Sequence, residues 1–158
     1  MKVFWRVLLV LFGVALVAAV AGVATLVRGF RTQDPRIMQP MRRFLNETVN
    51  PEALKRAGKA GEETAVIHHV GRTSGTEYST PIGAKPADGG FVVALPYGSD
   101  AHWVRNVVAA GSAVLELDGE THVVHDPEIV PIEDTAFATD EAWIMGVFGV
   151  REALLLRV

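Results

Sequence analysis

The stretch from Gly71 to Ile82 carries the residue types best suited to holding an anion. It reads Gly-Arg-Thr-Ser-Gly-Thr-Glu-Tyr-Ser-Thr-Pro-Ile. Two glycines bracket a tight polar turn, and such a turn can direct several backbone N–H groups at one point. Arg72 adds a fixed positive charge, and Thr73 and Ser74 add hydroxyl donors. The alternative for the turn alone is an ordinary hairpin whose arginine and serine are merely solvated.

Other reactive side chains in the sequence do not form a recognisable catalytic or metal pattern. His68 and His69 are adjacent on an expected strand, so their side chains point to opposite faces, and His122 and His125 also diverge. The chain has no cysteine, and no carboxylate falls at a clear metal spacing. We therefore expect no metal site, and we expect either His68 or His69 to be a hydrogen-bonded histidine inside the fold. Neither Ser74 nor Ser79 has the context of a nucleophile elbow.

The elements that must position these residues are mostly strands. The expected strands cover residues 64–70, 76–84, 90–95, 112–117, 121–125 and 153–158. Helices are expected at 101–110 and within 131–148, and Asp118-Gly119 is a strong hairpin signal. Pro81 makes the second strand an edge or a bulged strand. This order predicts an α+β fold, a small and largely antiparallel barrel beside helices, because a doubly wound fold would need regular βαβ alternation.

An uncharged run, Val7 to Val27, precedes this domain. Its 21 residues would span roughly 31 Å as a helix, which matches the hydrocarbon thickness of a bilayer. Phe4 and Trp5 stand where interfacial aromatic residues are expected. Lys2 and Arg6 precede the run and more arginines follow it, so the positive-inside rule predicts a single-pass anchor in the cell membrane with the C-terminal domain in the cytoplasm. The alternative is a cleaved signal peptide, with small-residue sites at 18–24.

Charge is divided unevenly along the chain of 158 residues, whose formal net charge is −3. Residues 1–59 hold 10 Lys and Arg against 3 Asp and Glu, and residues 60–158 hold 5 against 15. The acidic remainder argues against nucleic-acid binding, and the basic segment favours a membrane surface. We expect three parts: an anchor at 1–30, a basic juxtamembrane helical segment at 31–61, and a barrel domain at 62–158. The helix of the middle part could lie on lipid headgroups or pack on its own domain.

The order of motifs in the domain resembles that of the deazaflavin (F420)-dependent nitroreductase and quinone reductase family of flavin/deazaflavin oxidoreductases. The chain shows a strand, the turn Gly71-Arg72-Thr73-Ser74-Gly75, Pro81-Ile82, Asp88-Gly89-Gly90, and then His102-Trp103 and Asn106 on a helix. The resemblance covers about residues 62–130 and implies a split β-barrel. It implies coenzyme F420 as the cofactor, with FMN as the alternative.

The resemblance also implies where the cofactor would lie. Arg72, Thr73 and Ser74 would hold its phosphate or acidic tail. The segment Tyr78, Ser79, Thr80, Pro81, Ile82 and Gly83 would line its ring, and Leu95, Pro96, Tyr97 and Gly98 would add backbone contacts. A helix start at His102, Trp103 and Asn106 would face the anion. His102 is the candidate for proton donation to the reduced substrate.

The sequence departs from the family pattern at several positions. Thr73 stands where the family more often has a second basic residue, and Gly98 or Ser99 stands in place of a lysine. These two changes remove cations that would hold an anionic cofactor. No tyrosine follows Tyr97, so Trp143, Met145 and Phe148 are the candidates for the substrate wall.

The resemblance and the anchor together predict a membrane-anchored oxidoreductase. Reduced F420 would supply hydride to a lipophilic acceptor such as a quinone, and the anchor would raise the local concentration of that acceptor. The sequence leaves two alternatives open: an FMN-dependent reductase on the same barrel, and a non-catalytic membrane-anchored ligand-binding module. It also leaves open whether the chain forms a homodimer.

Overall fold

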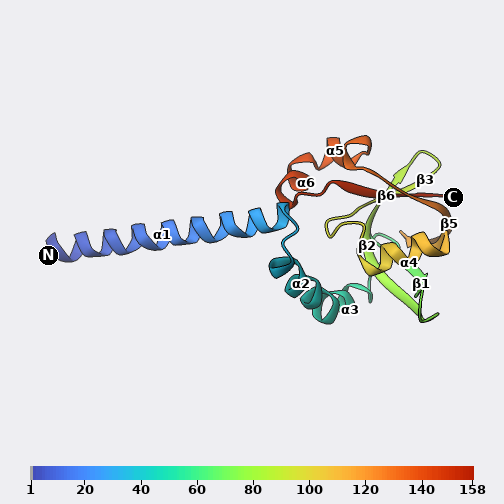
Figure 1. Ribbon diagram of the computed structural model, residues 1–158, viewed down its shortest axis with the longest axis horizontal. Helices are drawn as coiled ribbons and strands as arrows, with labels where there is room; N and C mark the ends of the chain where they lie inside the picture. The colour runs from blue at the N-terminus through green and yellow to red at the C-terminus, as the bar shows by residue number, and fades with distance from the viewer. Residues whose placement is uncertain (1) are drawn as a thin grey trace.

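A long apolar helix projects from a folded domain in the computed structural model of the protein (Figure 1). The structure describes the backbone of residues 2–158, and the side chains of these residues except 2–4 and 6–10. Helix α1 spans Lys2–Arg31. Within the described residues, Leu11–Arg31 is long and apolar enough to cross a membrane, by length and composition, and its most apolar stretch of 18 residues has no buried residue. The expectations for Lys2, Phe4 and Arg6 as flanking residues lie outside the described side chains.

Six antiparallel strands form a closed barrel, as the sequence predicts. They are β1 (Thr64–Val70), β2 (Glu77–Ala87), β3 (Gly90–Ala94), β4 (Ser112–Leu117), β5 (Glu120–Pro131) and β6 (Glu152–Arg157). Their order around the barrel is β1-β2-β3-β6-β5-β4. The α+β barrel fold with an N-terminal apolar helix is therefore confirmed.

Alternation along the strands explains why the barrel closes around an apolar core. In β1, Ala65 and Ile67 are fully buried in the barrel core, whereas His68, the next residue, is on the other face and half-exposed. Leu115, Leu154 and Leu156 complete this core from β4 and β6. The β4–β5 hairpin turns at Asp118 and Gly119, both with positive φ (51° and 79°), which suits the Asp-Gly pair predicted to turn there.

The ring of strand pairs is closed, but it leaves a split beside the first part of β2. Strand β2 pairs with β1 over Glu77–Gly83, but it pairs with β3 only over Ala84–Ala87. The first part of β2 therefore has a neighbour on one side only, in agreement with the edge position expected from Pro81. This free edge opens the barrel wall at the segment that the sequence assigns to ligand binding.

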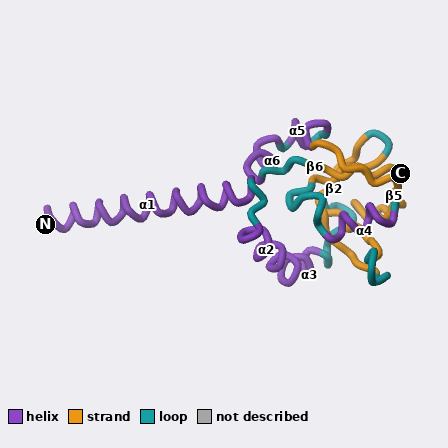
Figure 2. The backbone as a smooth tube through the Cα atoms, viewed as in Figure 1, coloured by secondary structure: helices purple, strands orange, loops and turns teal. Residues whose placement is uncertain are grey.

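A curved run of helix, which we call the helical strap (residues 35–53), lies opposite this opening (Figure 2). It consists of α2 (Pro35–Phe44), the π-helical turn η1 (Leu45–Val49) and α3 (Asn50–Ala53). Asp34 caps α2 by accepting a hydrogen bond from the Arg36 N–H at 2.9 Å, and Pro35 begins the helix. Met38 on α2 is 2% exposed. Of the two alternatives for this segment, the structure shows the helix packed on its own domain.

Helix α4 (His102–Ala110) plugs one end of the barrel. Val104 and Val107 are fully buried in the barrel core. Gly111 ends the helix with a φ of 73°, and its N–H bonds to the carbonyl of Val107. The core contact fixes α4, and so it fixes the residues on its exposed first turn.

The helix expected within residues 131–148 occurs as three short pieces. They are η2 (Ile132–Asp134), α5 (Phe137–Asp140) and α6 (Ala142–Phe148). Thr135 takes an extended conformation, and Glu141 lies outside the helical region with φ −130° and ψ 23°, so neither residue continues a helix. Strand β5 is also longer than expected, because it resumes pairing with β6 after an irregularity between His125 and Glu128.

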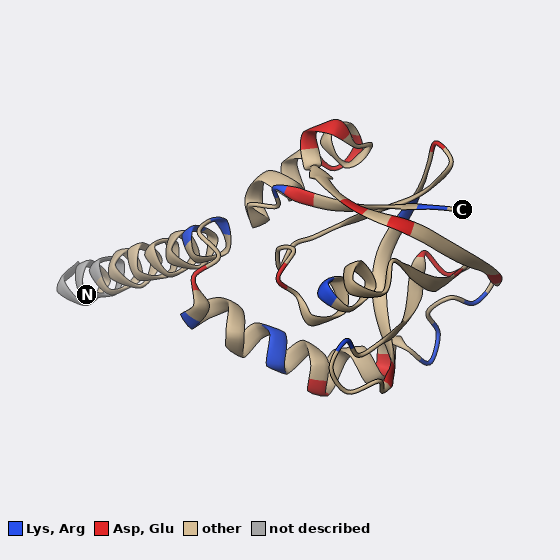
Figure 3. Ribbon diagram, turned by 45° about the vertical axis from the view of Figure 1, so that its right-hand side comes forward, with Lys and Arg blue, Asp and Glu red and all other residues tan. Residues whose placement is uncertain are grey.

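The last turn of α1 is joined to α6. The Arg31 Nε donates a hydrogen bond to the Gly146 carbonyl at 2.9 Å, and Phe30 meets Phe148 edge to face with ring centroids 5.3 Å apart. Basic residues mark this end of α1 and the strap, whereas acidic residues mark α5 and the neighbouring barrel strands (Figure 3). Basic and acidic residues, which are segregated along the sequence, are therefore also segregated in the folded protein.

Candidate functional site

A cleft of about 760 Å³ lies between the split in the barrel and the helical strap. The free edge of β2, the β1–β2 turn and the start of α4 form one side of it, and α2, η1 and α3 form the other. Ligand sites commonly enclose about 300–1,000 Å³. The cleft is therefore large enough for a cofactor or a substrate of that size.

Most of the residues that the sequence nominated line this one cleft. They are Arg72, Thr73, Ser74, Tyr78, Ser79, Thr80, Pro81, Tyr97, His102, Trp103 and Asn106. Ile82 and Leu95 instead lie in the barrel core, at 7% and 3% exposure. Gly83, Pro96 and Gly98 are not among the lining residues. The fold thus gathers the turn, part of β2 and the α4 start into one place.

The polar turn uses part of its own donor capacity. The Gly71 N–H bonds to the Thr76 carbonyl at 2.7 Å, and the Gly75 N–H bonds to the Gly71 carbonyl at 2.8 Å. Gly75 adopts a φ of 67°, which a glycine tolerates best. Only the N–H groups of Thr73 and Ser74 have no partner in the described part of this turn. The nest is consequently smaller than the sequence suggests.

A chain of hydrogen-bonded polar side chains, buried at its middle, connects this turn to β2. The Arg72 Nη1 donates to the Asn106 Oδ1 at 2.8 Å, and the Arg72 backbone N–H points at the same oxygen at 3.3 Å. The Asn106 Nδ2 lies 3.2 Å from the His69 Nδ1, and the His69 Nε2 lies 3.1 Å from the Thr80 Oγ1. Asn106 and His69 are 5% and 7% exposed. This chain ties β1, β2, α4 and the turn together.

His69 is the hydrogen-bonded interior histidine that the sequence expects at position 68 or 69. Its ring stacks on Tyr78, with centroids 5.7 Å apart and an interplanar angle of 23°. Burial lowers the pKa of His69, and the neighbouring His68 lowers that pKa further. Both effects favour the neutral form of the His69 ring. Its place on the cleft wall was not predicted, because a histidine in an apolar strand has no signal that separates a site from a core.

Arg42 is a second functional candidate that the sequence did not single out. It reaches from α2 into the cleft, donates through Nη2 to the Tyr97 carbonyl, and stands over the Tyr97 ring at 5.7 Å. Its Nε is buried and has no hydrogen-bond partner. Burial raises the pKa of Tyr97, against the opposing effect of the Arg42 charge. Arg42 thus places a positive charge in the cleft near Thr73 and Gly98, the positions at which the family pattern more often has basic residues.

The first turn of α4 presents free backbone donors to the cleft. Ala101 precedes the helix and has no side chain that can cap it. His102 is exposed at the cleft, and Trp103 packs partly against the barrel core. The free N–H groups and the helix dipole favour negative charge there.

The proposed substrate-wall residues lie elsewhere. Trp143 is 72% exposed on α6, Phe148 packs on Phe30, and Met145 packs against the smaller cluster of buried residues. None of the three lines the cleft. The cleft is lined instead by the strap residues Leu45, Asn46, Asn50 and Pro51 and by Leu54, which follows the strap.

A smaller hollow of about 550 Å³ lies on the outer face of β1 and β2. There, the His68 Nδ1 lies 2.8 Å from the Ser79 Oγ, and its Nε2 lies 3.2 Å from the Glu116 Oε1. The second contact has no hydrogen-bond geometry. Within the described residues, no group of three or more His, Cys, Asp and Glu could hold a metal ion.

Comparisons with known proteins add distant structural likenesses. No family model matches the chain, and no curated protein matches it. One similar solved structure is described as an F420-H2 dependent reductase (FDR-A), with 14% identity, a TM-score of 0.44, and coverage of 61% of this chain and 95% of that one. Another is described as a domain-swapped dimer, with 14% identity, a TM-score of 0.44, and coverage of 61% and 81%. At these values the likenesses carry no argument about this chain.

Proposed function

We propose that the protein is a membrane-anchored oxidoreductase that binds coenzyme F420 in the cleft and reduces a lipophilic acceptor such as a quinone. The observation that carries this proposal is the pair of arginines, Arg42 and Arg72, on opposite sides of one cleft. The Arg42 Nε is buried there without an acceptor. Both arginines line the cleft, where a phosphate or carboxylate oxygen could pair with their positive charges.

The remaining walls suit the rest of such a cofactor. Tyr78 and Trp103 are aromatic surfaces against which a flat ring could pack, and the free N–H groups of Thr73, Ser74 and the α4 start face the same space. A deazaflavin, when bound, supplies hydride transfer. The chain's own residues would bind its anion, fix the ring and exclude water, and His102 at the cleft would donate a proton to the reduced product.

The anchor determines which acceptor the cleft would meet. Helix α1 ends at Arg31, and Arg42 on the cleft wall follows 11 residues later. Residues 32–34 are not helical and α2 begins at Pro35, so four extended steps of about 3.5 Å and seven helical steps of about 1.5 Å allow at most roughly 25 Å. If α1 crosses a membrane, the cleft lies close to the surface on the side of Arg28 and Arg31, which the positive-inside rule makes the cytoplasmic side. A membrane-dissolved acceptor is therefore the natural substrate.

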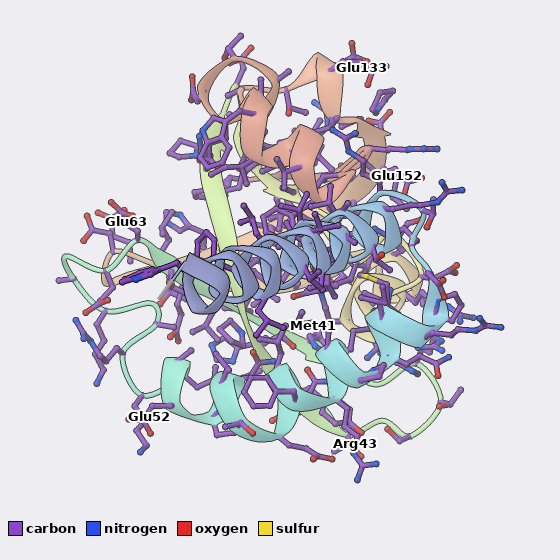
Figure 4. The ribbon with its side chains drawn as sticks, turned by 90° about the vertical axis from the view of Figure 1, so that its left-hand side faces the viewer. Met41, Arg43, Glu52, Glu63, Glu133 and Glu152 are labelled. Carbon is purple, nitrogen blue, oxygen red and sulfur yellow. The ribbon has the colours of Figure 1, made fainter. Side chains whose placement is uncertain are left out.

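The test is a fluorescence titration of the full-length protein in nanodiscs with F420, repeated with FMN. Loss of one charge-assisted contact should weaken binding about tenfold, so Arg42→Ala and Arg72→Ala should each show a loss of that order. Arg43→Ala is the matched control, because Arg43 is 79% exposed, pairs with Glu47 and points outward from α2 (Figure 4). The absence of binding of F420 to the wild-type protein at high micromolar concentration would reject F420, and binding of FMN alone would favour the flavin alternative.

A further inference from the structure

The polar chain from Arg72 to Thr80 has a defined direction of hydrogen bonding. Two N–H groups of Arg72, at Nη1 and at the backbone, converge on one Asn106 side-chain atom. Only an oxygen can accept from both, so the amide oxygen of Asn106 must face Arg72. The amide nitrogen then faces His69 and can only donate.

This direction determines the tautomer of His69. Because the Asn106 Nδ2 donates, the His69 Nδ1 must accept and carries no hydrogen. The neutral ring therefore carries its hydrogen on Nε2, which donates to the Thr80 Oγ1 at 3.1 Å. A protonated ring would set an Nδ1–H against the N–H of Asn106, so the arrangement disfavours the imidazolium independently of burial.

Thr80 stands at the end of this chain, on the wall of the cleft. Its oxygen accepts from His69, so its hydroxyl hydrogen must point elsewhere. Within the described residues, the Thr80 side chain makes no other hydrogen bond. Its sequence neighbours in the lining are Ser79 and Pro81, and Tyr78 follows on the same strand. The Ser79 hydroxyl is paired with His68 at 2.8 Å, and Pro81 and the Tyr78 ring offer apolar surface, so the Thr80 hydrogen is left for the open cleft.

We propose that the chain Arg72–Asn106–His69 fixes the direction of the Thr80 hydroxyl, so that Thr80 donates a hydrogen bond to a carbonyl oxygen of the ligand bound in the cleft. The inference rests on the proposed function for the ligand, whereas the direction of the hydroxyl rests on the protein alone. A carbonyl fits because Thr80 lies at the end of the chain away from the Arg72 guanidinium, beside the aromatic ring of Tyr78. The rings of both F420 and FMN carry carbonyl oxygens.

The first test determines the direction of hydrogen bonding from the tautomer of His69, in the absence of ligand. In the full-length protein in micelles with ¹⁵N-labelled histidine, we expect His69 to be neutral at pH 7 with its hydrogen on Nε2, and His69→Gln identifies its signals. Asn106→Asp should reverse the direction, because a carboxylate accepts from Arg72 and from the His69 Nδ1–H alike. A hydrogen on Nδ1 in the wild-type protein, or an unchanged tautomer in Asn106→Asp, would overturn the inference.

The second test reads the ligand contact by titration with F420 and FMN. Thr80→Val should weaken binding of the preferred cofactor about five- to tenfold, and Thr80→Ser should retain it, because serine keeps the donor. Asn106→Asp should also weaken binding of that cofactor although Thr80 is unchanged, because the reversed chain no longer directs the Thr80 hydroxyl at the cleft. Thr121→Val on the outer hollow is the control. Unchanged binding in Thr80→Val would overturn the contact between Thr80 and the ligand. If neither cofactor binds the wild-type protein, both this contact and the proposed function are rejected. The direction of the Thr80 hydroxyl would then still be supported by the tautomer of His69.

Discussion

Asn106 is the residue on which the polar wall of the cleft depends. Its amide joins Arg72 of the turn to the interior histidine on β1, and the contact of α4 with the core holds Asn106 in place. The sequence nominated Asn106, Arg72 and Trp103 through a resemblance in the order of motifs. It could not nominate His69 or Arg42, since their roles depend on contacts between segments distant in the chain.

The lowered pKa of His69 makes stability depend on pH. The unfolded chain binds a proton at this residue near pH 6.5, whereas the folded protein binds it only at a lower pH. As the pH falls below about 6.5, the unfolded state takes up a proton that the folded state refuses, and the free energy of unfolding decreases. We therefore expect the contribution of neutral His69 to the free energy of unfolding to be fully present above about pH 6.5. This contribution is lost as the pH falls through the pKa that His69 has in the folded protein.

The measurement is the thermal midpoint of the wild-type protein and of His69→Gln at pH 7 and pH 5. The charged or titratable groups around His69 are His68, Tyr78 and, through Asn106, Arg72. The midpoint should fall more on acidification in the wild-type protein than in His69→Gln. His125→Gln on the exposed face of β5 should behave like the wild-type protein. Equal falls in all three proteins would contradict the role given to His69.

At the scale of elements, local signals located the strands better than the helices. Strand β1 occupies the predicted residues 64–70, and the Asp118-Gly119 hairpin forms as expected. Strands and tight turns depend on the types of a few neighbouring residues, and these local patterns can be recognised in the sequence. The breaks between η2, α5 and α6, and the packing of the strap across the cleft, depend on contacts that no local pattern contains.

The close approach of Gly90 on β3 to the backbone of β6 leads to a prediction about the stability of the barrel. A Cβ at Gly90 would overlap the backbone carbonyl of Leu156 on β6, which cannot move without displacing the strand. We expect Gly90→Ala to destabilise the domain by about 2 kcal/mol and to lower the thermal midpoint by about 4–8 °C. Gly83→Ala on β2 is the control, because its Cβ would meet no atom within 4 Å. Equal midpoints for the two variants would show that the β3–β6 contact is looser than described.

At the scale of the whole molecule, the helix and the domain give a prediction about location. If α1 is a retained anchor, the full-length protein should sediment with membranes and resist extraction by alkaline carbonate, because burial of an apolar span is effectively irreversible. The mass of the extracted protein should include residues 1–30. A shorter soluble product that begins within 18–24 would support cleavage instead.

The separation of an apolar N-terminal helix from a folded domain was predictable from the apolar run and the charge of the sequence. The function of the middle segment was not, because a basic amphipathic helix has the same pattern whether it covers lipid or protein. The structure places Arg42 and Leu54 of this segment on the cleft wall. A fragment that begins at residue 60 would consequently lack one side of the proposed site.

The joint between α1 and the domain has a practical consequence. The contacts described for it involve residues 29–33: Phe30 on Phe148, Arg31 on Gly146, and the Gln33 Nε2 on the Pro96 carbonyl at 3.1 Å. A shortened chain that begins at Thr25 would therefore keep these contacts, the strap and the whole cleft. It would also lose most of the apolar run, so that ligand exchange and crystal growth could be followed in plain buffer.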